Sequence, residues 1–123
     1  MSAVLLATGC GGRHDKQVAD ALERAGSWAA TVKVITEQWA QSRVSLRFTR
    51  TTLTTASENL QRDAKSIRGL DGAAAARIDR LRSAIDPVMA AVEGNQPDRA
   101  RDAAIPLVDI VEPRPTPASA RPE

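Results

Sequence analysis

Apolar residues recur every three or four positions over most of this chain, which is the spacing of one face of an α-helix. Between residues 15 and 68 there is no proline and a single glycine, Gly26, so no residue in this stretch marks a helix end. From Leu46 on, the apolar positions keep a seven-residue phase that is typical of a coiled-coil-like seam. The positions with this spacing are Val18, Leu22, Ala25, Ala29, Val32, Ile35, Trp39, Leu46, Leu53, Leu60 and Ile67.

The segment RVSLRFT at residues 43–49 departs from this pattern, because its apolar and polar positions alternate as in a β-strand. No second run of this kind is present to pair with it, and a lone strand leaves its backbone groups without hydrogen bonds. We therefore expect helix here, with a bend or tight turn near residues 41–45. Either one helix over residues 15–68 is formed, about 80 Å long at 1.5 Å per residue, or a hairpin that buries both tryptophans. The unbroken phase and the lack of glycine or proline favour the long helix.

A clear helix end follows in SIRGLDG. Gly69 is suited to the left-handed position just past a helix, and Asp71 to the N-cap of the next one. The next helix is predicted from about Gly72 to Val92, antiparallel to residues 46–68 because the connection is short. Its predicted buried stripe is Ala74, Ile78, Leu81, Ile85, Val88 and Val92.

Prolines divide the rest of the chain. Pro87 predicts a kink in the preceding helix, or a restart with Asp86 as the cap. After the breaker EGNQP, Pro97 opens a shorter helix that Pro106 interrupts. Residues 112–123 hold four of the seven prolines, so we expect a disordered tail.

The composition fits one small domain, which we place at residues 15–111. Hydrophobic residues make up 42% of the 123 residues but aromatic ones only 2%, so we expect a thin, alanine-rich core with closely packed helices. Trp28 and Trp39 are three helical turns apart and are expected to pack on the core rather than form a partner-binding stripe. The predicted fold is all-α: a long helix or helical hairpin packed with one or two shorter antiparallel helices, as a small bundle.

The N-terminal segment differs from the rest of the chain in charge, because it carries no charged side chain before Arg13. An apolar run at residues 3–7 leads into ATGC, which ends at Cys10, the only cysteine of the chain. This segment resembles the end of a bacterial lipoprotein signal peptide, with alanine at residue 7, where leucine is commonest. In such peptides the cysteine thiol receives diacylglycerol.

The resemblance implies a lipid anchor. Residues 1–9 would be a truncated signal peptide whose charged leader lies upstream of the assigned start, and Cys10 would become the lipidated N-terminus. Residues 10–14 would then be a flexible tether, and Gly11 is compatible with passage to the outer membrane. Two acyl chains hold a protein on a membrane stably, whereas one does so only marginally. The expected location is the bacterial cell envelope, at the outer membrane or its periplasmic face.

Candidate catalytic and metal-binding residues are scarce. The chain has one histidine, His14, and one cysteine, whereas nucleophilic catalysis needs a base beside the nucleophile. Di-metal helical bundles need paired Glu-x-x-His motifs, and a phosphate loop needs a lysine after its glycines. Neither pattern is present. We therefore expect no enzymatic activity, no metal and no cofactor.

The charge of the chain is slightly positive, +2, with fourteen arginines and three lysines. Binding of single-stranded nucleic acid also needs aromatic stacking platforms, so no nucleic-acid partner is expected. The arginines fall into two sets, and we expect both to be solvated; the alternative is a patch for anionic headgroups, lipopolysaccharide or an acidic partner. The sets are Arg43, Arg47 and Arg50 on one helical face, and Arg77, Arg80 and Arg82 on the later helix.

These features favour a lipid-anchored, non-catalytic structural or adaptor module. Its partners would be the membrane, through the acyl chains on Cys10, and a protein partner or second copy, through helical surface. One alternative is a periplasmic binding or stress-sensing module that recognises an anionic ligand or lipid. Another is a cytoplasmic helical protein in which Cys10 is incidental.

Overall fold

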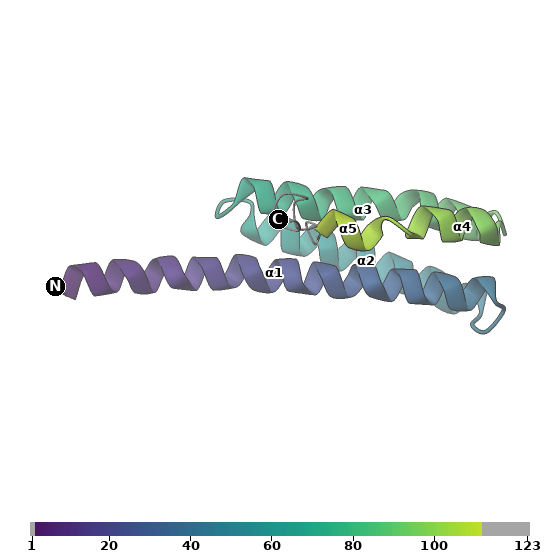
Figure 1. The fold of residues 1–123 in the computed structure, drawn as a ribbon, viewed down its shortest axis with the longest axis horizontal. Helices are drawn as coiled ribbons and strands as arrows, with labels where there is room; N and C mark the ends of the chain where they lie inside the picture. Colours follow the sequence, from purple (N-terminus) through teal and green to yellow (C-terminus); the bar gives the residue numbers. More distant parts are fainter. Residues whose placement is uncertain (1, 112–123) are drawn as a thin grey trace, which may run out of the picture.

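The chain folds as an up-and-down bundle of α-helices (Figure 1). The computed structural model describes the backbone of residues 2–111 and the side chains of residues 13–111. The predicted all-α class is confirmed, since the described residues contain helices and no strand. The predicted tail at residues 112–123 lies outside them. The helices are α1 (Ser2–Ala40), α2 (Leu46–Ile67), α3 (Gly72–Glu93), α4 (Pro97–Ala104) and α5 (Leu107–Val111).

The chain reverses direction between α1 and α2, so the prediction of one helix over residues 15–68 is wrong and the hairpin is formed instead. Ser42 adopts a left-handed backbone conformation, with φ 63°. Its N–H donates to the carbonyl of Trp39 at 2.9 Å, and the N–H of Arg43 donates to that of Gln38 at 2.8 Å. Helices commonly end in this way at a glycine. Here a serine takes the glycine's place, and the turn falls within the predicted residues 41–45.

The other turns also differ from the expected glycine pattern. No glycine among the described residues has a positive φ, so Gly69 is not the left-handed residue that was predicted. The α2–α3 turn is closed instead by the N–H of Asp71, which donates to the carbonyl of Ile67 at 2.8 Å. Asp71 is the N-cap of α3, as predicted, and its side chain accepts from the N–H of Ala74 at 3.0 Å. In the α3–α4 turn, Asn95 takes the left-handed position, with φ 54°.

The prolines have different effects. Helix α3 runs through Pro87 without a restart, so the alternative with Asp86 as a cap is wrong. Ile85 and Val88, on either side of this proline, are buried in the core, and this packing offsets the backbone hydrogen bond that proline cannot make. As predicted, Pro97 is in the first turn of α4, and Pro106 separates α4 from α5.

Helix α1 begins far upstream of the helical domain predicted from residue 15. Its backbone is helical from Ser2, and this helix includes residues 10–14, for which a flexible tether was predicted. Glycine lowers helix stability by about 1 kcal/mol relative to alanine, yet Gly11 and Gly12 continue the helix. The N-terminal part of α1 projects beyond the other helices (Figure 1).

The core is built from a mixture of alanines and larger aliphatic residues, as expected from the composition. On α1 the buried positions include Ala21, Ala25 and Ala29, whose small side chains let neighbouring helices approach closely. All six residues predicted for the buried stripe of α3 are buried. Trp28 and Trp39 are half-buried and pack against the core, which confirms the expectation for both. The larger core residues are Val32, Leu53, Leu60, Ile67, Ile78, Leu81, Ile85, Val88, Val92, Leu107 and Val111.

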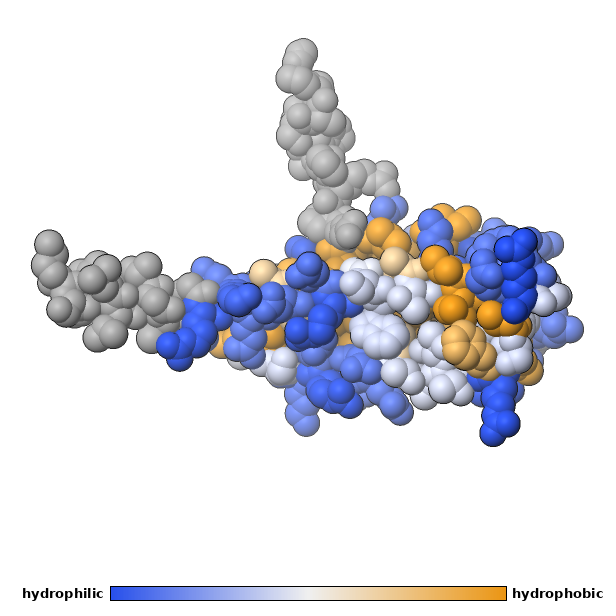
Figure 2. Space-filling model, turned by 90° about the horizontal axis from the view of Figure 1, so that it is seen from below, coloured by the Kyte–Doolittle hydropathy of each residue, from blue (hydrophilic) through white to orange (hydrophobic). Residues whose placement is uncertain are grey.

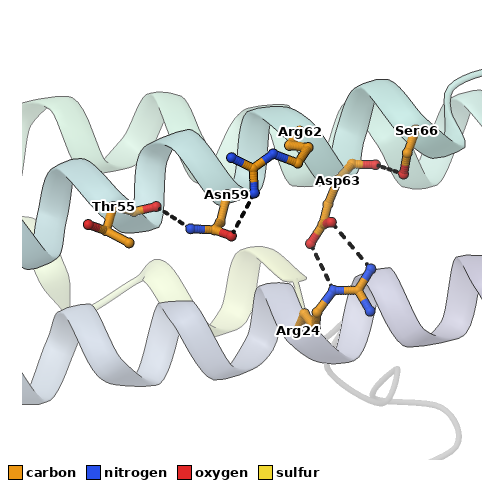
Figure 3. A network of polar contacts seen from close by, with 6 residues as sticks. All are labelled: Arg24, Thr55, Asn59, Arg62, Asp63 and Ser66. Atoms are coloured by element: carbon orange, nitrogen blue, oxygen red, sulfur yellow. Dashed lines mark hydrogen bonds and ion pairs between the residues drawn. The ribbon is translucent and has the colours of Figure 1, made fainter.

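Arginine–carboxylate ion pairs join neighbouring helices around the bundle. Arg24 on α1 reaches Asp63 on α2 with two hydrogen bonds, of 3.1 and 3.2 Å (Figure 3). Such exposed pairs contribute about 0–1 kcal/mol each, so they fix which helix faces align more than they stabilise the bundle. Three further pairs of this kind are Arg50–Glu93, Arg68–Asp79 and Arg101–Glu37.

Candidate interaction groove between α1 and α4–α5

A groove of about 660 Å³ lies between the second half of α1 and the α4–α5 pair. Small residues line both walls, since Ala30 of α1 and Ala104 of α4 stand where larger side chains would fill the space. Beyond Ala104 this wall continues with Ile105 and Val108, which lie on either side of the break between α4 and α5 at Pro106. The volume is within the range of about 300–1,000 Å³ that is typical of ligand sites. We call this feature the α1/α4–α5 groove.

Two large apolar side chains stand beside the groove. Val34 is 56% exposed and Ile105 is 60% exposed, and they are the two most exposed large hydrophobic residues among those described. A second hollow along α1 shares Ala30 and Val34 with the groove and extends the apolar surface to Ile35. Figure 2 shows hydrophobic residues gathered on this face, over the half of the molecule away from the N-terminus. Contiguous exposed apolar surface of this kind marks interaction sites.

Charged residues of both signs surround the apolar centre. Arg101 donates from Nε and Nη2 to the carboxylate of Glu37, at 2.9 and 3.1 Å. These hydrogen bonds, and a further one from Gln41, lower the pKa of Glu37 below its ordinary value of 4.5. Lys33 and Asp102 also line the groove. The groove is therefore apolar within and balanced in charge at its edge.

Acidification is expected to weaken the Glu37–Arg101 pair. Because the folded-state pKa of Glu37 is lowered, its stabilising effect is present above the unfolded pKa and is lost as the pH falls through the folded pKa. Thermal unfolding of the wild type and of Glu37→Gln should therefore differ near neutral pH, with the wild type melting higher. The two melting temperatures should converge as the pH falls below the lowered, folded-state pKa of Glu37.

The control for this prediction is Glu58→Gln, which removes an exposed carboxylate that has no ion pair within the described structure. Its melting temperature should follow that of the wild type over the same pH range. A pH-independent gap between wild type and Glu37→Gln would show that the charge of Glu37 does not stabilise the fold.

Thr36 is a polar residue at the base of the groove. The residue is fully buried, and its Oγ1 has no hydrogen-bond partner. A buried hydroxyl without a partner is destabilising. No function was assigned to Thr36 from the sequence; its only signal was a polar residue beside the apolar stripe, four residues after Val32.

The structure separates the arginines that the sequence grouped together. Arg43 is in the α1–α2 loop rather than on the helical face of Arg47 and Arg50, so the predicted single face is wrong. Arg50 is bound to Glu93 by hydrogen bonds of 2.7 and 3.0 Å. Arg47 is exposed in the first turn of α2. On α3, Arg80 is exposed whereas Arg77 and Arg82 are half-buried.

The remaining candidate residues are at the N-terminal end of α1. The side chain of Cys10 lies outside the described residues, and His14 is exposed. Among the described residues, no three histidine, cysteine, aspartate or glutamate side chains are grouped so that they could hold a metal ion. None of the helices described is both long and apolar enough to cross a membrane.

Comparison with known proteins adds no relative: no protein-family model, no curated protein and no solved structure matches the chain. The fold and the groove together define a class of architecture, a small up-and-down helical bundle with an open apolar groove on one face.

Proposed function

We propose that this protein is a lipid-anchored, non-catalytic module of the bacterial cell envelope that pairs with a second copy of itself through the α1/α4–α5 groove. The observation that carries the proposal is the exposure of Val34 and Ile105 beside an apolar hollow. A surface that holds both a protrusion and a hollow can pair with its own copy about a two-fold axis, which is how most homodimers form.

The charges at the groove edge support a second copy as the occupant. Lys33 and Arg101 are positive, and Glu37 and Asp102 are negative, so the edge has no net charge. Two copies related by a two-fold axis bring such an edge against itself, and an edge without net charge can do so without net repulsion. A strongly acidic or basic partner has no complementary field here.

The test for pairing is sedimentation equilibrium of the full chain with Cys10→Ser, which removes the acylation site. We expect this parent protein to dimerise, and Val34→Glu or Ile105→Glu to raise the dimer dissociation constant at least about tenfold, because each buries a charge at the apolar centre. Phe48→Glu is the matched control. Phe48 is 51% exposed, much like Val34, and it does not line the groove.

Circular dichroism of each variant confirms that the bundle is folded. A parent protein that is monomeric at high micromolar concentration would contradict pairing, and so would an equal effect of the control and groove substitutions.

The lipid anchor rests on the sequence around Cys10 and its resemblance to lipoprotein signal peptides. The projection of the N-terminal part of α1 beyond the bundle is consistent with it, because an anchor there leaves the groove accessible (Figure 1). Metabolic labelling of bacteria with a fatty-acid analogue should label the wild type, which should partition into detergent. Cys10→Ser should remain unlabelled and aqueous. A native protein with Met1 and a free thiol would favour the cytoplasmic alternative.

A further inference from the structure

The end of the bundle opposite the N-terminus carries a second exposed surface. It is formed by the α1–α2 loop and the first turn of α2 (Figure 1). Two large apolar residues are exposed there, Leu46 by 40% and Phe48 by 51%. Arg43 and Arg47 are exposed beside them in sequence, and neither forms an ion pair with another described residue. We call these four residues the hairpin tip.

The backbone holds the hairpin tip in a fixed arrangement. Ser45 caps α2, because its Oγ accepts from the N–H of Phe48 at 3.0 Å. Residues on a helix are about 100° apart around its axis, so Leu46 and Phe48 lie on either side of Arg47. The buried Thr49 fixes this turn on the core. The side chains therefore point outward from a rigid turn rather than from an unstructured loop.

The charge of the hairpin tip is positive and uncompensated. Glu37, the nearest carboxylate to Arg43 along the chain, is bound by Arg101, and Glu93, which reaches α2 from α3, is bound by Arg50. Arg43 and Arg47 are consequently available for an anionic group outside the protein. Arginine is suited to such binding, because its planar guanidinium donates two parallel hydrogen bonds to a phosphate.

We propose that the hairpin tip is a membrane-contact surface that docks on lipid containing anionic phospholipid. Exposed leucine and phenylalanine beside arginine form the combination that binds the boundary between headgroups and acyl chains, where apolar side chains are buried and cations meet phosphate. The inference does not rest on the proposed function, because it needs neither the lipid on Cys10 nor a dimer.

The position of the hairpin tip adds a geometric constraint. About thirty residues of α1 separate Cys10 from the loop, which is roughly 45 Å of helix at 1.5 Å per residue. A molecule attached at both ends therefore lies along one membrane or connects two surfaces at about this distance.

The test is co-sedimentation of the full chain with vesicles. The parent is again Cys10→Ser, and the vesicles contain either equal parts of phosphatidylglycerol and phosphatidylcholine or phosphatidylcholine alone. We expect binding to the anionic vesicles only. The double substitution Leu46→Ser and Phe48→Ser should weaken it about tenfold, as should Arg43→Ser with Arg47→Ser, and the arginine pair should also reduce its salt dependence.

Two controls separate this surface from others. Arg80→Ser removes an exposed arginine on α3, and Val34→Ser removes an exposed apolar residue at the groove. Both should bind like the parent. Absence of binding by the parent, or equal losses in the controls and the hairpin-tip variants, would overturn the proposal. Binding to polyglutamate that is as tight as to vesicles and indifferent to Phe48 would also overturn it, and would indicate an acidic protein partner.

Discussion

Replacing Leu60 with alanine is expected to lower the free energy of unfolding by about 2–5 kcal/mol. Leu60 is fully buried on α2, the helix that packs most extensively against α3. Its neighbours one turn away on either side are Ala56 and Ala64, which are too small to fill the space that the substitution leaves. Urea denaturation followed by circular dichroism measures the loss, with an unchanged slope if the unfolded state is unaffected.

The control is Leu46→Ala, which makes the same chemical change on the same helix at a position that is 40% exposed. It should cost clearly less than Leu60→Ala, because the side chain of Leu46 is partly exposed and its truncation leaves no closed cavity. Similar losses at both positions would contradict the packing of α2, since a shifted register would bury the two leucines to a similar degree.

Replacing Thr36 with valine is expected to raise the free energy of unfolding by about 1–3 kcal/mol. Valine has nearly the shape of threonine, and the hydroxyl that it removes is buried without a hydrogen-bond partner. Few single substitutions in a packed core stabilise a protein. An increase in stability would therefore indicate that the hydroxyl of Thr36 is buried without a hydrogen bond. The measurement is again urea denaturation, at a protein concentration below that at which pairing occurs.

Thr49→Val provides the matched comparison. Thr49 is also fully buried, but its Oγ1 donates to the carbonyl of Ser45 at 2.9 Å. Loss of this hydrogen bond should destabilise the protein by about 0.5–1.5 kcal/mol, so the two valine substitutions should have opposite signs. Destabilisation by both would mean that the hydroxyl of Thr36 is hydrogen-bonded in solution, through a water in the groove.

Helical periodicity predicted the elements of this fold better than their connections. Six of the eight buried residues of α3 were predicted, all but Ala75 and Ala91, because a 3.6-residue period reports directly which face is buried. The hairpin after α1 was only the less favoured alternative, because its left-handed residue is Ser42 rather than a glycine, whereas Gly69, the expected residue of this kind, has no positive φ. A short polar side chain visits this conformation rarely, and composition does not reveal where it does so.

The groove could not be predicted from the sequence at all. Its walls include Ala30 and Ala104, which are far apart in the chain and line one groove only after the bundle is formed. Neither alanine differs in the sequence from the other alanines of a helix. The arginines illustrate the same limit, since the loop removes Arg43 from the face that spacing assigned to it, and Glu93 neutralises Arg50 from another helix. The lipid on Cys10 stays a prediction from sequence.

The division of the last helix at Pro106 has a consequence for how the molecule comes apart. Both α4 and α5 are shorter than the length of about 12–15 residues that isolated helices need in water. Each is therefore helical only while it is docked on the first and third helices. Residues 97–111 are therefore the part of the described chain whose helical structure depends most on packing, and their undocking would remove one wall of the groove.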